Sequence, residues 1–172
     1  MEWLILLLAA LVWAIVIYNL LVRDRNRVLA AWSDIDVQLK RRHDLIPKLV
    51  DATRAYAGYE AATLAELTRL RAASDAQAEP AARAELEHRL GSRLHRLFAL
   101  AEAYPELKAS SQFLQLQRDL SDTEDQIQYA RRYYNGAVRN LNVRIESFPD
   151  LLVARLFGFR PAAFFELEPE RG

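Results

Sequence analysis

The chain has 172 residues, with 23 basic and 23 acidic side chains and no cysteine. This length fits one domain, and a net charge of zero argues against a nucleic-acid-binding protein, which normally carries a basic face for phosphates. The lack of cysteine excludes disulfides, thiolate metal sites and a cysteine nucleophile. Because glycine and proline are scarce while 52% of the residues are hydrophobic, we expect an all-α fold of long helices.

The first predicted element is a transmembrane helix over residues 3–22. These twenty residues carry no charge, and their length matches a bilayer core of roughly 30 Å. The segment follows Glu2 and lacks the basic start and small-residue cleavage site of a signal peptide, so we interpret it as a retained anchor. Because Arg23, Arg25 and Arg27 follow directly, the positive-inside rule predicts a cytoplasmic C-terminal part and an N-terminus outside.

Beyond the anchor, apolar residues recur at steps of three and four and predict one continuous helix to about Ser74. We expect this helix to continue through Pro47 with a kink near residues 43–47, because the apolar stripe resumes in register. The stripe consists of Val28, Trp32, Ile35, Leu39, Ile46, Leu49, Tyr56, Leu67 and Leu70, and polar residues interrupt it at Arg42, Thr53, Glu60 and Thr63.

Three further helices are predicted, with prolines at their boundaries. The second covers residues 80–104 and is ended by Pro105. A short fourth helix covers 149–157, with Gly158 as its expected C-cap, and the residues after Pro161 are expected to fray. The third covers 109–148, with core residues seven positions apart at Phe113, Leu120, Ile127, Tyr134, Leu141 and Phe148.

Short connections between long amphipathic helices predict antiparallel neighbours. Residues 23–160 should therefore form an elongated four-helix-type bundle behind the anchor (1–22), followed by a tail over 161–172. An apolar end of this bundle should lie near the membrane, where we expect it to cap the core around Trp32; contact with lipid or with a membrane partner is the alternative. The apolar end consists of Phe148, Leu151, Leu152, Leu156, Phe157 and Phe159.

Two blocks of sequence, Tyr18–Val50 and Leu107–Pro149, carry a distinctive pattern. The first contains Ile-Asp-Val-Gln-Leu-Lys-Arg-Arg at 35–42, and shorter matching stretches follow the second at 158–159 and 164–166. The pattern resembles the LemA family of bacterial membrane-anchored helical proteins. This resemblance implies a single plasma-membrane span before an antiparallel bundle, with no catalytic activity firmly attached. The genes of the family often lie near those of membrane metalloproteases and a magnetosome-associated branch exists, which implies a role in membrane-protein quality control or envelope organisation.

Charged residues on the first and third predicted helices form the main candidate site. In the predicted antiparallel alignment, residues 131–135 fall opposite about 40–46, so Asp44 is expected near Arg131. We interpret the set as an ionic layer that fixes the helix register, because buried ion pairs select one alignment more than they add stability; a docking surface is the alternative. The set comprises Asp34, Asp36, Arg41, Arg42, Asp44, Glu124, Arg131, Arg132 and Asn135.

The sequence predicts no enzyme, metal site or cofactor. Only Glu85 and His88 have the Glu-x-x-His spacing, whereas a di-iron bundle needs two such pairs and two more glutamates. His88 and His95 lie beside three arginines, and we interpret them as part of a solvated basic face. We therefore expect a scaffold or adaptor that binds an unknown membrane protein, a metalloprotease by family association. The alternative is a self-associating protein that organises or shapes the membrane.

Overall fold

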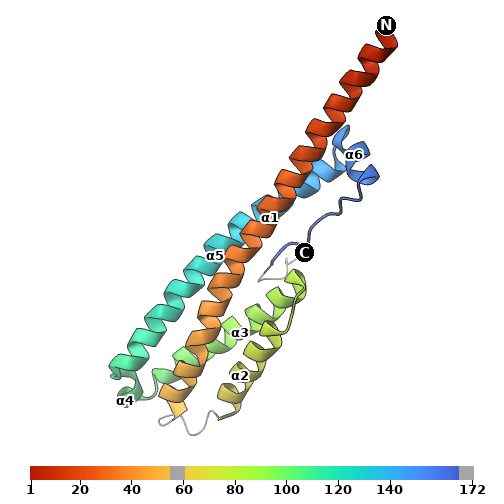
Figure 1. Cartoon of the computed structure of the whole chain (residues 1–172). Coiled ribbons are helices and arrows are strands. Elements are labelled where there is room, and N and C mark those ends of the chain that lie inside the picture. The colour runs from red at the N-terminus through yellow and green to blue at the C-terminus, as the bar shows by residue number, and fades with distance from the viewer. Residues whose placement is uncertain (55–60, 167–172) are drawn as a thin grey trace. The chain divides into compact units, whose positions relative to one another are not determined.

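A computed structural model of the chain describes residues 1–54 and 61–166, which form six helices and no strand (Figure 1). The predicted all-α class is confirmed. Some of the predictions concern residues outside the described ranges, namely Tyr56, Glu60 and residues 167–172. In chain order the helices are α1 (Glu2–Arg54), α2 (Ala61–Asp75), α3 (Pro80–Ala101), α4 (Pro105–Lys108), α5 (Ser111–Glu146) and α6 (Asp150–Leu156).

The chain divides into two compact units, each built from segments that are distant in sequence. Unit 1 comprises Met1–Asp34 and Arg132–Phe164, and unit 2 comprises Ile35–Arg131 and Phe165–Gly172. Helices α1 and α5 therefore contribute residues to both units.

The prediction of a single helix from the anchor to Ser74 is wrong, although α1 does continue past Pro47. His43 of α1 lies 2.6 Å from Asp75 at the end of α2, whereas 32 residues of one straight helix would separate them by about 48 Å. Helix α2 therefore packs back against α1. The apolar stripe keeps its phase in both helices because both bury it in one core, so periodicity alone does not distinguish a long helix from a helical hairpin.

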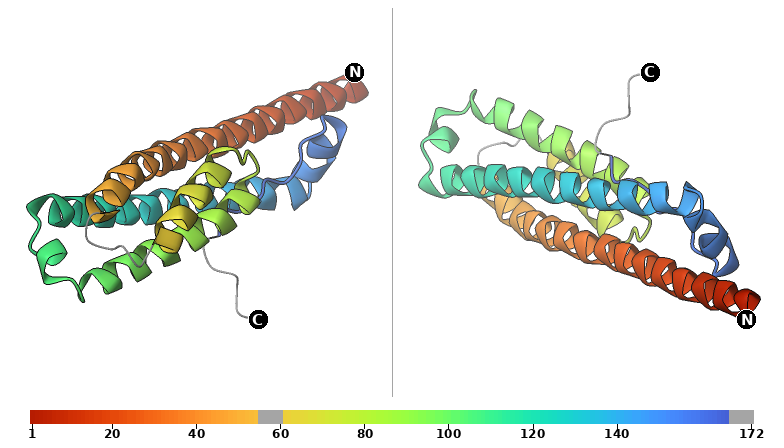
Figure 2. Two further views of the ribbon diagram at one scale, coloured as in Figure 1. Left: turned by 90° about the horizontal axis from the view of Figure 1, so that it is seen from below. Right: turned by 90° about the horizontal axis from the view of Figure 1, so that it is seen from above.

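Unit 2 is a bundle of the C-terminal part of α1, α2, α3 and the N-terminal part of α5. Helices α2 and α3 lie side by side in both views of Figure 2. Pro80 occupies the first turn of α3, and the Glu79 carboxylate accepts hydrogen bonds from the N–H groups of Ala81 and Ala82, which fixes the start of the helix. The core that these helices share includes Ile46, Leu49, Leu67, Leu70, Leu90, Leu97, Leu107 and Phe113.

Unit 1 contains the start of α1, the C-terminal part of α5, and α6. The end of α6 is closed by Gly158, whose φ of 70° lies in the left-handed region that glycine adopts without strain. Phe159 N–H donates to the carbonyl of Ala154 at 2.9 Å and Gly158 N–H donates to that of Arg155 at 3.3 Å, which is the Schellman pattern. Gly158 thus closes α6 as predicted, one position after the C-cap residue Phe157.

The segment after Pro161 is held in place as far as it is described, so the prediction of a frayed tail is wrong for residues 161–166. The Asn142 side chain pairs with both backbone groups of Ala162, at 2.8 and 3.0 Å. The Tyr134 hydroxyl donates to the carbonyl of Ala163 at 2.8 Å, and Phe165 is fully buried. Such side-chain-to-backbone bonds leave no periodic pattern in the sequence of the segment that they hold.

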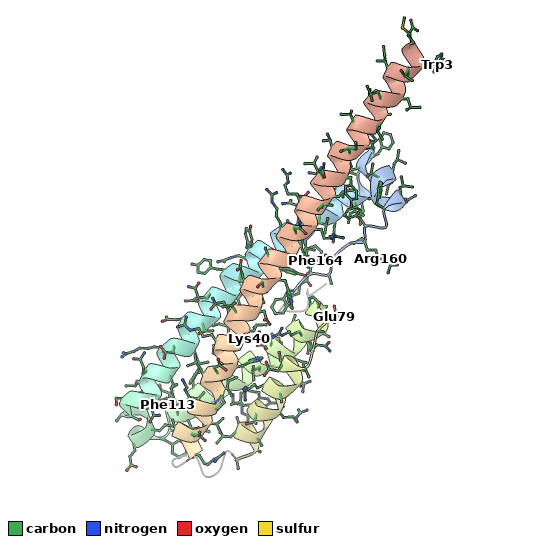
Figure 3. All side chains as sticks on the ribbon, in the orientation of Figure 1. Trp3, Lys40, Glu79, Phe113, Arg160 and Phe164 are labelled. Carbon is green, nitrogen blue, oxygen red and sulfur yellow. The ribbon has the colours of Figure 1, made fainter. Side chains whose placement is uncertain are left out.

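The N-terminal part of α1 is long and apolar enough to cross a membrane. Its large side chains are exposed from Trp3, at 84%, to Val16, at 50%. Figure 3 shows the side chains around Trp3 pointing outward from the ribbon. A face of this kind is suited to a lipid environment.

Candidate functional site

A layer of polar side chains crosses the core of unit 2 and forms the candidate functional site, here called the polar layer. All four helices of the bundle contribute to it, and its centre is Glu87 of α3, whose side chain has no exposed surface. A carboxylate in such a position must be neutralised and fully hydrogen-bonded, because an isolated buried charge is very costly. The members of the polar layer are Arg42 and His43 of α1, Ser74 and Asp75 of α2, Glu87 of α3, and Glu124 of α5.

Three donors from two other helices converge on Glu87. His43 Nε2 lies 2.6 Å from one carboxylate oxygen, and the Ser74 hydroxyl donates to the same oxygen at 2.5 Å. Arg42 Nη1 donates to the other oxygen at 3.4 Å. Both oxygens of Glu87 are thus satisfied without water, and these hydrogen bonds tie α1 and α2 to α3.

Arg42 extends the polar layer to α5. Its Nη2 lies 3.2 Å from a carboxylate oxygen of Glu124, while its side chain is only 3% exposed. The guanidinium lies against α3 at Gly91, where an added Cβ would come within 2.9 Å of Nη2. Glycine therefore leaves the space in which this cation reaches two carboxylates from different helices.

His43 lies between two carboxylates, since its Nδ1 is 2.6 Å from an oxygen of Asp75 while Nε2 contacts Glu87. Only the protonated imidazolium can donate through both nitrogens. Burial by itself lowers the pKa of His43, but the hydrogen bonds and charges of Glu87 and then Asp75 outweigh burial and raise that pKa above its ordinary value of 6.5. The favoured state is therefore a charged histidine.

The pKa of Glu87 moves in the opposite direction. Burial acts to raise it, but the hydrogen bond from His43, the charge of Arg42 and the hydrogen bond from Ser74 bring the pKa below its ordinary value of 4.5. The polar layer is thus built to keep both Glu87 and His43 ionised.

A second ion pair links α1 to α3 next to the polar layer. Arg83 Nη1 lies 2.8 Å from Asp36 Oδ1, and Lys40 Nζ lies 3.0 Å from Asp36 Oδ2. Burial acts to raise the pKa of Asp36, but the hydrogen bonds and charges of Lys40 and Arg83 lower it overall. Asp36 therefore supports the same register between α1 and α3.

A hollow of about 420 Å³ opens beside the polar layer, with Arg42, Glu87, His95, Glu124 and Arg131 among its lining residues. Both acidic and basic groups face it. Within residues 1–54 and 61–166, no group of three histidine, aspartate or glutamate side chains is placed to hold a metal ion.

The structure brings together only part of the predicted ionic set. It pairs Arg42 with Glu124, and it joins Asp36 to α3 instead of α5. The predicted approach of Asp44 to Arg131 is wrong, because α5 is shifted along α1. With Glu124 at Arg42, Arg131 lies two turns further along α5, and Asp44 is exposed.

The other members of the predicted set lie outside the polar layer. Asp34 and Arg41 are exposed, whereas Arg132 and Asn135 belong to unit 1.

Four members of the polar layer were missed as site residues: His43, Ser74, Asp75 and Glu87. A signal for Glu87 is present in the sequence. Following the heptad pattern of α3 backwards from Leu94 and Leu90 leads to Glu87 and then Arg83, which are both buried. Periodicity alone favours the neighbouring apolar residue, Leu86, as the core position, and this assigns Glu87 to the surface.

The predicted apolar end does not cap a core. Phe148, Leu152, Leu156 and Phe157 are all more than half exposed, while Leu151 and Phe159 are half-buried. Helix α6 buries its smaller side chains, Val153 and Ala154, and directs the larger ones outward.

Similarity to known proteins gives an independent indication of kinship. A model of the LemA family matches residues 31–171. Protein LemA of Metamycoplasma hominis is 32% identical over 149 residues, which cover 86% of this chain and 68% of that protein. Magnetosome proteins MamQ 2 of Paramagnetospirillum magneticum and MamQ of Magnetospirillum gryphiswaldense are 32% and 30% identical over 79 residues, 46% of this chain. That match covers 29% of each magnetosome protein.

The first prediction concerns the dependence of stability on pH. Because the pKa of His43 is raised by folding, its contribution is fully present below pH 6.5 and is lost as the pH rises through the folded-state pKa. The contribution of Glu87 is present above pH 4.5 and is lost as the pH falls through its lowered pKa. Thermal unfolding of the full chain in detergent, followed by circular dichroism, should therefore show a maximum between these limits.

His43→Gln isolates the histidine contribution. We expect a loss of up to about 3 kcal/mol near pH 6, because the variant leaves the buried carboxylate of Glu87 with Arg42 as its one remaining cation, and a smaller difference from the wild type at alkaline pH. His95→Gln, at an exposed position, is the control and should retain the wild-type profile. An unchanged alkaline decline in His43→Gln would contradict the role of His43.

The second prediction compares two helical glycines. Gly136→Ala has open space around its new Cβ and should stabilise the chain by about 0.5–1 kcal/mol through helix propensity. Gly91→Ala should not show this stabilisation. Its free energy of unfolding should be about 1 kcal/mol or more below that of Gly136→Ala, because its Cβ displaces Arg42 from Glu87 and Glu124. Equal increases in the midpoints of thermal unfolding would show that Arg42 moves aside without cost.

Proposed function

Because the chain belongs to the LemA family, we propose that it is a single-pass membrane scaffold whose helical bundle binds another protein at the bilayer surface. The observation that carries this proposal is the continuity of α1. One helix, Glu2–Arg54, begins with exposed apolar residues suited to lipid and later supplies Arg42 and His43 to the polar layer. Anchor and bundle thus share one secondary-structure element.

The polar layer supports a structural role for the interior of unit 2. Its charges are committed to one another, and a buried ionic network favours one alignment of helices over its alternatives. A bundle with a fixed register presents constant outer faces, and those faces carry exposed apolar side chains such as Val37 of α1 and Tyr129 of α5. We assign partner binding to these outer faces and not to the interior.

The family resemblance supports a role in membrane-protein quality control, with a membrane metalloprotease as the candidate partner. The relatives named magnetosome proteins favour a second candidate function, in which copies of the chain associate with one another to organise or shape the membrane.

The third prediction concerns topology. We place the protein in the bacterial plasma membrane with the N-terminus outside, because the exposed Arg23, Arg25 and Arg27 follow the apolar segment directly. In a bacterial host, a green fluorescent protein fused after Gly172 should fluoresce, and alkaline phosphatase at the same point should be inactive. An active phosphatase fusion would show that the orientation is the reverse of the one proposed.

The fourth prediction tests the scaffold itself. A photo-crosslinking amino acid at Val37 or Gln126, on different helices of unit 2, should capture a second protein when the full-length chain is irradiated in cells. Capture at one position only would assign the binding face, and each position serves as the control for the other. Products that contain only copies of this chain would favour the self-associating alternative. The absence of any product at either position would contradict both.

A further inference from the structure

Helix α6 lies beside the predicted membrane span. The Tyr18 ring of α1 contacts the Phe157 ring at 4.8 Å and the Phe159 ring at 5.8 Å between centroids. Both views of Figure 2 place α6 along the N-terminal part of α1. Tyr18 lies four residues inside the end of the apolar segment 3–22, so these contacts occur at a level that the span needs for crossing the bilayer.

The length of the predicted span also places α6 at the depth of the membrane. A bilayer core of roughly 30 Å requires about 20 helical residues, which is the length of segment 3–22. If α6 were kept out of the bilayer, only residues 3–16 would remain for crossing, and these extend about 21 Å. Ile17 and Leu21 are already buried by protein, at 8% and 0% exposure. The protein that surrounds this part of α1 must therefore share the depth of the membrane.

The outer face of α6 has the chemistry for that position. Phe148 and Leu156 are 79% and 78% exposed, and Leu152 lies one turn before Leu156 on the same face. Val153 and Ala154 turn inward. Large apolar side chains exposed along one short segment are unfavourable in water but are stabilised in the boundary between acyl chains and headgroups.

Charged groups mark the level at which water begins. Arg144 of α5 bridges Asp24 of α1, at 2.7 Å, and Asp150 at the start of α6, at 3.0 Å. This bridge holds α6 to α1 just beyond residue 22. The guanidinium of Arg25 lies 5.6 Å from the centroid of the Phe159 ring, and Arg155 of α6 is exposed. Arginines at this level can reach lipid phosphates while their stems cover apolar surface.

We propose that α6, together with Phe148 and Phe157, is a second membrane element that lies in one leaflet beside the anchor. Lipid acyl chains and headgroups cover its exposed apolar face. This inference rests on the anchor proposed above. In this arrangement α1 crosses the whole bilayer, whereas α6 enters one leaflet only. A leaflet-embedded wedge of this kind displaces lipid on one side of the bilayer only.

Spin labelling of the full-length chain in vesicles of phosphatidylethanolamine and phosphatidylglycerol tests the proposal. Because the chain has no cysteine, each introduced thiol is unique. Labels at Leu152→Cys and Leu156→Cys should relax several-fold more with oxygen, which concentrates in lipid, than with a water-soluble nickel chelate. Val143→Cys, on the exposed face of α5 in unit 1, is the matched control and should show the reverse preference. Leu8→Cys reports on the anchor.

The outcomes separate the two proposals. A lipid-like label at Leu8 with water-like labels at Leu152 and Leu156 would overturn the α6 assignment and leave the anchor intact. A water-like label at Leu8 would overturn both. Labels at α6 that neither reagent reaches would show that protein covers this face. A second copy of the chain or a partner protein would then contact it in place of lipid, which would overturn the proposal. Lipid-like labels at both places would establish the embedded helix.

Discussion

The bundle of unit 2 depends on the burial of one carboxylate, that of Glu87. A negative charge without solvent contact is tolerated only if cations and donors surround it, and here Arg42, His43 and Ser74 supply them from α1 and α2. Their positions are therefore coupled. Sliding α1 by a turn would remove both cations from the carboxylate and leave only the Ser74 hydroxyl, and a buried charge without its cations is strongly destabilising. A buried charge with partners on two helices favours this register over its alternatives, while the leucines fill the core around it.

Neighbouring features of the bundle follow from the same requirement. The imidazole of His43 needs a second acceptor, and the last residue of α2 provides it as Asp75. The guanidinium of Arg42 needs room next to α3, and Gly91 provides it although glycine is unfavourable inside a helix. The position of this glycine in the middle of α3 is thus explained by a cation that occupies the space of the missing side chain.

The sequence was sufficient to predict the helical class, the apolar span, the start of α3 at Pro80 and the closure of α6 by Gly158, because each rests on local chemistry. It was insufficient for the return of α2 and the alignment of α5. The return of α2 could not be predicted because the spacing of apolar residues is the same whether the helix continues or folds back. The alignment of α5 could not be predicted because it depends on which charged side chains of distant helices form pairs. Arg42 was correctly singled out as an interruption of the apolar stripe. Glu87 was missed, because an apolar alternative, Leu86, lay next to it.

The bridge from Asp24 to Arg144 joins residues 120 positions apart, and this separation has a consequence for biosynthesis. At about 5–20 residues per second, a ribosome needs on the order of ten seconds after making Asp24 to reach Arg144. The apolar segment is therefore complete long before Asp24 acquires its long-range partner. Arg23 and Arg27, which lie 3.7 and 3.5 Å from Asp24 Oδ1, are available from the beginning. The nascent chain thus carries its own temporary counterions for Asp24, directly after the apolar segment, until the last helices are made.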